Sequence, residues 1–344
     1  MNVFKSKCRV ARPDNQGETS VSIYPKYNFL KFIIIAIALT SIGLHGCSDQ
    51  NGSTRTYKLV TGPQGGAWYP LGGALKALIE NDQSDIKVQV LPGGGVSNAL
   101  ALHTGQAQIA LAQSVTSLDA IDGKPPFQEP LQNICNIATL YRQYFQVVTL
   151  AKSSVNNPFE LKNKVLATQP KGATGEAITN HLLQAHGMDY ESLDNVSFGS
   201  YTDSVTLMKD GNADVFTLTT TIPSGAVMDL ASSRSIKLMS MSEESHKKML
   251  KINSKYERGF IPKGTYPKQN DDVATIFWYT HLAARCDVEN QVISRILDVV
   301  QSGSMELVSV TKAIEGLDIE TMTRDIGVPM HPGAIEWYEK QKQQ

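Results

Sequence analysis

The feature that most constrains the fold of this chain is a unit of strand, glycine-rich loop and helix that recurs along its first half. In the first copy, residues 57–60 alternate as a strand does, and residues 61–73 form the loop and the helix start. Apolar residues at 71, 74, 75, 78 and 79 predict one buried helical face. The free N–H groups and the positive end of the helix dipole suit a carboxylate or phosphate near Gly66 and Tyr69. A plain strand-to-helix turn without a ligand explains this one loop equally well.

The second copy has the same outline. Residues 87–91 alternate as a strand, residues 92–95 form a loop that includes Gly95, and a helix follows and ends near Gly105. Ser97 and Asn98 lie in the first turn of this helix, where a hydroxyl or amide can cap the helix or meet a ligand.

The third copy repeats the order without a glycine loop. Residues 108–112 form an apolar strand, Gln113 and Ser114 follow it, and a short helix comes next. Open α/β sheets bind ligands at the carboxyl ends of their strands. Three successive strand ends with small or polar residues therefore indicate a ligand site more strongly than any one loop does.

The pattern restarts from about residue 153. Residues 164–168 form a strand, the loop 171–176 contains Thr174, and a helix follows. Another strand covers residues 213–218, and Thr220 lies at its end. A second set of units predicts a second α/β lobe.

The expected architecture is α/β, with two lobes joined by a two-crossing hinge and a central cleft. Lobe 1 comprises residues 56–150 and 265–344, and lobe 2 comprises residues 151–264. The β-rich run 275–280 is the predicted return strand to lobe 1. A cleft between two hinged lobes is a preferred ligand site.

One cation has a place near this cleft. Residues 134–140 and 146–150 predict two strands, with Tyr141 and Arg142 in the connection between them. A guanidinium makes a bidentate pair with a carboxylate. A solvated turn arginine is the alternative.

The N-terminus has the pattern of a secretory signal. Lysines precede the apolar run 32–39, and Leu44, Gly46 and Cys47 after it resemble a bacterial lipobox. Residues 1–46 are the predicted signal peptide, Cys47 is the predicted lipidation site, and residues 47–55 form a tether. Plain secretion with cleavage near Gly46 is the alternative. Both place the mature protein outside the cytoplasm, and in the first a lipid anchor is its only contact with the membrane.

Charge and cysteine content narrow the class of protein. The full chain has a net charge of −1, with no basic tract, so nothing indicates a nucleic-acid partner. Of the cysteines in the mature chain, Cys135 and Cys286 are free to pair in an oxidising compartment, and Cys135 also suits a simple core position.

Catalytic signatures are missing from the sequence. It has no G-x-S-x-G, H-E-x-x-H, C-x-x-C or Walker motif, and the first loop does not match the dinucleotide fingerprint. No histidines stand at metal-binding spacing, and most are expected on helix surfaces. We therefore predict no catalytic residues, no metal and no cofactor, and a binding protein instead of an enzyme.

Several motifs together resemble one known family. They are Thr61-Gly62 with Gly65-Gly66 and residues 69–74, then residues 94–98, 105–110, 112–114, 140–141, 261–267 and 330–334. These stretches resemble the TAXI family, the TRAP-associated extracytoplasmic immunogenic proteins. The resemblance covers nearly all of the mature chain.

The resemblance implies a type II periplasmic binding-protein fold. It also implies a small carboxylate ligand, such as glutamate, glutamine or 2-oxoglutarate, that is delivered to a TRAP membrane permease. A ligand-sensing lipoprotein of the same fold that feeds a signalling receptor is the alternative, and an enzyme on this scaffold is a third reading. The predicted ligand-binding residues are Gly66, Tyr69, Gly95, Ser97, Asn98, Gln113, Ser114, Tyr141, Arg142, Thr174 and Thr220.

The second-lobe loop departs from the family pattern. The family often has Gly-Ser-Gly-Thr there, whereas residues 172–175 read Gly-Ala-Thr-Gly. The ligand's second polar end is therefore expected to be held differently, with Thr220 or Arg142 as compensating groups.

Overall fold

The computed structural model describes residues 54–63, 66–82 and 85–343. The predicted signal peptide, Cys47 and nearly all of the tether lie outside these residues, as do Gln64 and Gly65 of the first glycine loop. Within the described ranges, no helix has both the length and the apolar character needed to cross a membrane.

The described residues alternate between strands and helices. The strands are β1 (Arg55–Val60), β2 (Ile86–Leu91), β3 (Ile109–Gln113), β4 (Cys135–Leu150), β5 (Val165–Thr168), β6 (Asn195–Phe198), β7 (Val215–Thr220), β8 (Ile236–Leu238), β9 (Glu257–Ile261) and β10 (Val273–Ala284). The α-helices are α1 (Trp68–Asp82), α2 (Gly95–His103), α3 (Ser114–Asp122), α4 (Thr174–Ala185), α5 (Tyr201–Asp210), α6 (Gly225–Ser233), α7 (Glu243–Ile252), α8 (Asn290–Ser302), α9 (Ser304–Val310), α10 (Ile319–Met322) and α11 (Pro332–Gln341). Short 3₁₀ turns are η1 (Pro158–Leu161), η2 (Tyr190–Ser192) and η3 (Lys312–Ile314).

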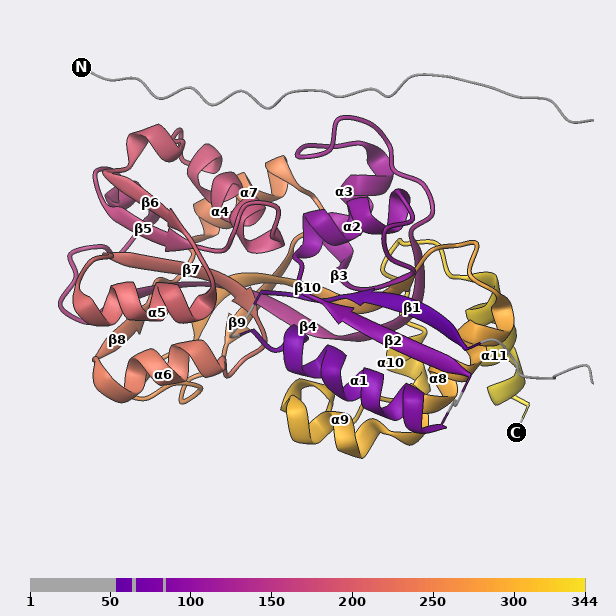
Figure 1. The fold of residues 1–344 in the computed structure, drawn as a ribbon. Helices are drawn as coiled ribbons and strands as arrows, with labels where there is room; N and C mark the ends of the chain where they lie inside the picture. Colours follow the sequence, from indigo (N-terminus) through magenta and orange to yellow (C-terminus); the bar gives the residue numbers. More distant parts are fainter. Residues whose placement is uncertain (1–53, 64–65, 83–84, 344) are drawn as a thin grey trace, which may run out of the picture. The chain divides into compact units, whose positions relative to one another are not determined.

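One sheet joins two groups of parallel strands, in the order β2-β1-β3-β10-β4-β7-β5-β6 (Figure 1). Strands β1, β2 and β3 are parallel at one end, and β5, β6 and β7 are parallel at the other. Between them run β4, with 16 residues, and β10, with 12 residues, each antiparallel to its neighbours. Strand β10 pairs with β3 of the first group, β4 pairs with β7 of the second, and β4 and β10 pair with each other, so the fold is two α/β lobes joined by two long strands, as the sequence predicted.

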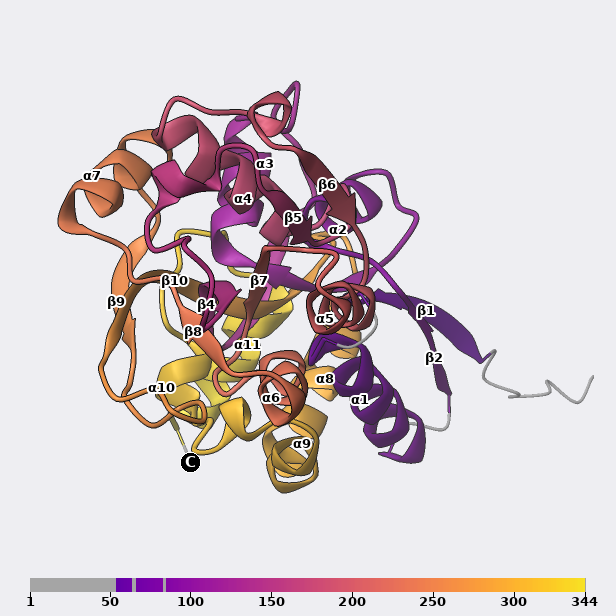
Figure 2. The ribbon, with the colours of Figure 1, turned by 90° about the vertical axis from the view of Figure 1, so that its left-hand side faces the viewer.

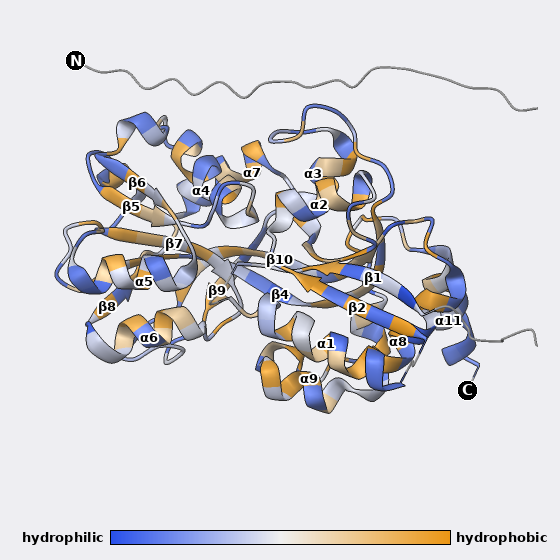
Figure 3. Ribbon diagram, viewed as in Figure 1, coloured by the Kyte–Doolittle hydropathy of each residue, from blue (hydrophilic) through white to orange (hydrophobic). Residues whose placement is uncertain are grey.

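Helices cover both faces of each lobe, as Figure 2 shows from the side. In the first lobe, α1, α8 and α11 share a core with Leu71, Ile293 and Trp337, and α2 and α3 cover the opposite face. In the second lobe, α4 and α7 pack around Met249, and α5 and α6 pack around Phe216. Strand β7, with three hydrophobic residues and three threonines, is buried along its whole length, whereas the helices carry mixed faces (Figure 3). This burial on two faces follows from the near-continuous apolar runs of the parallel strands.

The predicted break between two strands at residues 141–144 is wrong. Residues Cys135–Leu150 form the single strand β4, and its ladder with β10 continues through this segment, with Arg142 opposite Tyr279 and Tyr144 opposite Phe277. Polar residues in the middle of the run hid the strand from an apolar pattern. Arg142 therefore lies on a crossing strand and not in a solvated turn. The predicted return strand at 275–280 is confirmed as part of the longer β10.

The predicted loop-to-helix units are confirmed. Helices α1, α2, α3 and α4 each follow the loop or strand end that the sequence indicated. Helix α7 and strand β9 were not predicted. The cysteine question is also answered, because Cys135 and Cys286 form a disulfide that ties the start of β4 to the residues just after β10.

Candidate ligand-binding site

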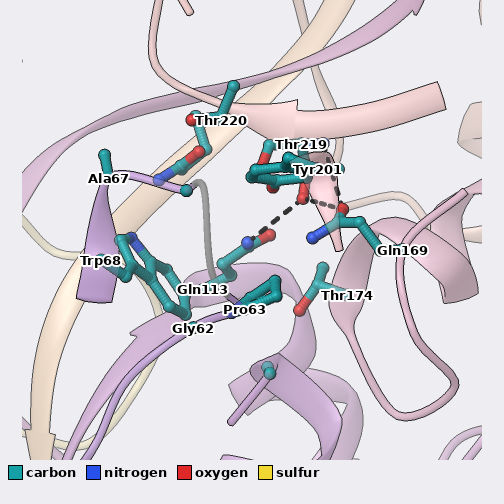
Figure 4. Close-up of a pocket in the computed structure, with 14 residues that line it drawn as sticks. Gly62, Pro63, Ala67, Trp68, Gln113, Gln169, Thr174, Tyr201, Thr219 and Thr220 are labelled. Carbon is teal, nitrogen blue, oxygen red and sulfur yellow. Dashed lines mark hydrogen bonds between the residues drawn. The ribbon is translucent and has the colours of Figure 1, made fainter. Parts of the chain in front are cut away.

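A cavity of about 20 Å³ lies where the two lobes meet (Figure 4). A volume of this size holds about one water molecule, so a larger ligand fits only if the lobes move apart. The residues that line it come from both lobes and are Gly62, Pro63, Gly66, Ala67, Trp68, Gly94, Gly95, Gln113, Gln143, Gln169, Thr174, Tyr201, Thr219 and Thr220.

Helix N-termini form much of the cavity wall. The residues at the starts of α1, α2 and α4 line it, as does Gln113, the N-cap residue of α3. No side chain caps α2, α3 or α4, whereas a serine caps each of α5, α6 and α7. Helices α8 and α9 also lack a side-chain cap but do not line this cavity. The uncapped ends at the cavity leave backbone donors and positive dipole ends directed at one place.

The second lobe supplies a fixed polar wall. Gln169 Oε1 accepts from the Thr219 N–H at 3.1 Å and from its hydroxyl at 2.9 Å, and the Tyr201 hydroxyl donates to the Thr219 carbonyl at 2.6 Å. From the first lobe, Gln113 Nε2 lies 3.5 Å from Thr219 Oγ1, and Trp278 Nε1 donates to Gln113 Oε1 at 2.5 Å. Each of these side chains is therefore held in one orientation around the cavity.

The lining residues are all neutral. They are glycines, amides, hydroxyl-bearing residues, Pro63, Ala67 and Trp68, and burial raises the pKa of Tyr201 so that its phenol stays protonated. Two buried polar atoms in this wall, Trp68 Nε1 and Gln143 Oε1, have no hydrogen-bond partner. A buried polar group without a hydrogen bond destabilises the folded protein by about 1–3 kcal/mol. A polar ligand that hydrogen-bonds to these two atoms would remove that destabilisation.

The two lobes touch around the cavity. The Ser97 N–H donates to the Gly172 carbonyl at 3.0 Å, and the hydroxyls of Thr116 and Thr174 are 2.8 Å apart. A Cβ on Gly95 would stand 1.7 Å from Thr174 Oγ1, and a Cβ on Gly66 would stand 2.7 Å from the Tyr201 ring. Glycine at these loop positions is therefore required by the approach of the opposite lobe.

The structure brings five of the predicted site residues to the cavity. They are Gly66, Gly95, Gln113, Thr174 and Thr220. These residues lie at the loop and strand ends where the sequence pattern indicated a ligand.

The other six predicted residues lie outside the cavity lining. Asn98 is buried and holds the loops together, because its Nδ2 donates to the carbonyls of Thr61 and Leu111 and its Oδ1 accepts from the Gly94 N–H. Ser97 Oγ donates to the Gly94 carbonyl.

The remaining four have other surroundings. Ser114 Oγ accepts from the Tyr279 N–H, and Tyr69 is 39% exposed on α1. Tyr141 is buried, and its hydroxyl has no partner. Arg142 is exposed, with its guanidinium 4.7 Å from the centre of the Phe277 ring.

Sequence reasoning missed Gln143, Gln169 and Tyr201. Gln169 comes directly after the predicted strand 164–168, so the strand-end rule that selected Gln113 could have found it. Tyr201 lies at the start of α5, shortly after β6, which is a position of the same kind. Gln143 had no such signal, because the segment around it was taken as a turn.

One buried group of side chains has the arrangement of a serine, histidine and amide catalytic triad. Ser117 Oγ lies 2.9 Å from His281 Nε2, and His281 Nδ1 lies 3.1 Å from Asn136 Oδ1. All three side chains are at most 1% exposed, and burial lowers the pKa of His281 to about 3. No substrate reaches this serine, so the group is a core hydrogen-bond network.

The expectation that most histidines lie on helix surfaces is wrong. His186, His246, His281 and His331 are buried. Within the described residues, no three His, Cys, Asp or Glu side chains are grouped as a metal site.

The chain is similar to one protein family and to several solved structures. The model of the NMT1-like family matches residues 59–341. A solved structure described as a periplasmic transporter aligns with a TM-score of 0.51 at 10% identity, covering 84% of this chain and 93% of the other. This likeness agrees with a type II periplasmic binding-protein fold.

Two further solved structures align less closely. An ancestral arginine-binding protein has a TM-score of 0.47 at 12% identity and covers 76% of this chain and all (100%) of its own. The periplasmic aliphatic sulphonate-binding protein of Escherichia coli has a TM-score of 0.40 at 12% identity, with 84% of each chain covered.

Proposed function

The chain belongs to the NMT1-like family, and from the cavity between its lobes we propose that it is an extracytoplasmic solute-binding protein. Its ligand is a small carboxylate, either an amino acid such as glutamate or glutamine or a dicarboxylate such as 2-oxoglutarate. The protein binds and releases this ligand unchanged.

The observation that carries the proposal is a small cavity lined by neutral polar groups and by uncapped helix N-termini. Backbone N–H groups at a helix N-terminus bind a carboxylate without a cationic side chain. Trp68 Nε1 offers one more donor, and Gln143 Oε1 offers an acceptor for an N–H group of the ligand. A ligand with a carboxylate at one end and an amide or ammonium group at the other uses both.

Binding is coupled to lobe closure. The proposed lobes are residues 56–150 with 265–344, and residues 151–264. Gly66, Gly95 and Gln113 face the ligand from one lobe, and Gln169, Thr174 and Thr220 face it from the other. Since the ligand touches both walls only when they meet, it favours the closed arrangement.

The proposed location is outside the cytoplasm, with residues 1–46 removed and Cys47 carrying the lipid. The disulfide between Cys135 and Cys286 supports this location, because disulfides persist in oxidising compartments. The TAXI-like motifs support delivery of the ligand to the permease of a TRAP transporter.

Isothermal titration calorimetry of the purified protein tests this function. The panel contains L-glutamate, L-glutamine, 2-oxoglutarate and other small carboxylates. We expect saturable binding of at least one member, with about tenfold or more weaker binding of its analogue in which the C1 carboxylate is an amide. An absence of binding across the panel, or equal binding of the amide analogue, contradicts the proposal.

A further inference from the structure

A second and larger cavity, of about 360 Å³, lies against the opposite face of the crossing strands. In the β4–β10 ladder, Gln143 pairs with Trp278, and Arg142 pairs with Tyr279. Successive residues of a strand face opposite sides, and paired residues face the same side. Gln143 therefore faces the ligand cavity, while Arg142 and Tyr279 line the second cavity, here called the arginine pocket.

Two exposed guanidinium groups of the arginine pocket lie over aromatic rings. Arg142 Cζ lies 4.7 Å from the centre of the Phe277 ring, and Arg324 Cζ lies 5.4 Å from the centre of the Tyr279 ring. The two rings pack edge to face with their centres 6.0 Å apart. Within the described residues, neither arginine has an ion-pair partner within 4.0 Å. The pocket thus presents two cations that have no ion-pair partner among the described residues.

The rest of the lining suits an anion that carries an apolar body. Glu315 is the only acidic side chain among the lining residues, so the lining has two positive charges and one negative charge. Leu140, Ile222 and Leu317 add apolar surface beside Tyr144. A bare inorganic anion would leave this apolar surface unused, whereas a carboxylate on an apolar body would cover it.

We propose that the arginine pocket is a second binding site, specific for a carboxylate on an apolar body and separate from the ligand cavity. Such a carboxylate has two sources, a free organic acid and an acidic side chain of a protein that docks on this face. The site draws residues from both proposed lobes, since Ile222 follows β7 while Leu317 and Arg324 belong to the C-terminal part. Its occupant therefore contacts both sides of the hinge.

The arginine Nε–H signals in two-dimensional NMR spectra of the purified protein test this site directly. Single substitutions Arg142→Gln and Arg324→Gln assign the two signals. The probes are benzoate for a free acid, acetyl-Leu-Glu-amide for a protein side chain, and inorganic phosphate for an anion without an apolar body. The indole signal of Trp68, assigned with Trp68→Phe, reports binding in the ligand cavity in the same spectra. The proposed function and the proposed second site are therefore tested independently.

We expect both arginine signals to follow one saturable curve with benzoate or with the peptide. Binding of benzoate supports a free acid, and binding of the peptide alone supports a protein partner. Arg324→Gln should weaken binding about tenfold, read on the Arg142 signal, because a charge-assisted hydrogen bond is lost. Lys87→Gln is the control, since it removes an exposed charge on the edge strand β2, outside this lining, and should leave affinity within about twofold.

The proposal is overturned if neither organic probe moves the arginine signals. It is equally overturned if phosphate binds as tightly as both organic probes, or if Arg324→Gln leaves the Arg142 titration unchanged. Thermal unfolding of each variant shows whether the fold is intact.

Discussion

Replacement of Gly94 by alanine should prevent the lobes from closing while leaving each lobe folded. Gly94 is the N-cap of α2, with φ −170°, an extended conformation that any residue adopts. An added Cβ would stand 2.8 Å from Ala173 Cα, 3.0 Å from Ala173 Cβ and 3.2 Å from the Gly172 carbonyl oxygen. These atoms belong to the opposite lobe. The nearest is a main-chain atom, which cannot move away by a change of side-chain rotamer.

The size of the effect follows from these distances. Carbon atoms pack favourably at about 3.5–4.0 Å, so the Gly94→Ala loop must stop roughly 0.7 Å short of its present approach. Overpacking of this kind costs about 1–3 kcal/mol. If that cost falls on the closed, ligand-bound form alone, the dissociation constant rises by about 5- to 150-fold. The free energy of unfolding without ligand should change by no more than about 0.5 kcal/mol.

Calorimetric titration with the tightest ligand of the panel, together with urea unfolding in its absence, measures both quantities. Gly73→Ala on α1 is the matched control, because a Cβ there meets no atom within 4 Å. The control should keep wild-type affinity. Wild-type affinity in Gly94→Ala, or an equal loss in Gly73→Ala, would refute the reasoning that ligand binding requires this approach.

Three further substitutions test the ligand cavity, the disulfide and a buried carboxyl group. Trp68→Phe removes a buried donor that has no protein partner, so it should weaken ligand binding about tenfold by calorimetry. Because Trp68 is also part of the buried core, the smaller ring should lower the unfolding free energy as well, and a loss of stability with unchanged affinity would contradict the role in binding. Replacing Cys135 and Cys286 by serine opens a link between residues 151 apart and should lower the unfolding free energy in urea by about 2–4 kcal/mol, and no change would contradict a stabilising disulfide. Burial raises the pKa of Asp119 to about 6. The folded protein therefore binds the proton of the Asp119 carboxyl group more tightly than the unfolded chain does. Its contribution to stability is complete below about pH 4 and is lost as the pH rises through about 6. In Asp119→Asn, the free energy of unfolding measured in urea should depend less on pH between about 4 and 6. An unchanged pH dependence would show that another group is responsible.

The fold was largely predictable because its signals are local. The glycine loop before α2 and the apolar face of α1 each depend on residues a few positions apart, and periodicity reports them directly. The crossing strand β4 was missed because Arg142 and Gln143 interrupt the apolar run. Its continuity depends on pairing with β10, more than a hundred residues away in sequence.

The site was predictable at the level of loops but not of side chains. Asn98 and Thr174 both follow glycines at helix starts, yet one binds main-chain carbonyls inside its own lobe and the other lines the cavity. Which partner a polar side chain meets is decided by packing between distant segments. On β4 a shift of one residue separates Gln143 in the ligand cavity from Arg142 in the arginine pocket, and only the register fixes which faces which.

A crystal structure of the protein with the tightest ligand of the panel tests the proposed binding mode most directly. We predict electron density in the cavity between the lobes, with the ligand carboxylate on the N–H groups at the starts of α1 and α2 and its other polar end near Gln169 and Tyr201. Density that contacts one lobe only, or a ligand bound elsewhere with this cavity filled by side chains, would contradict it.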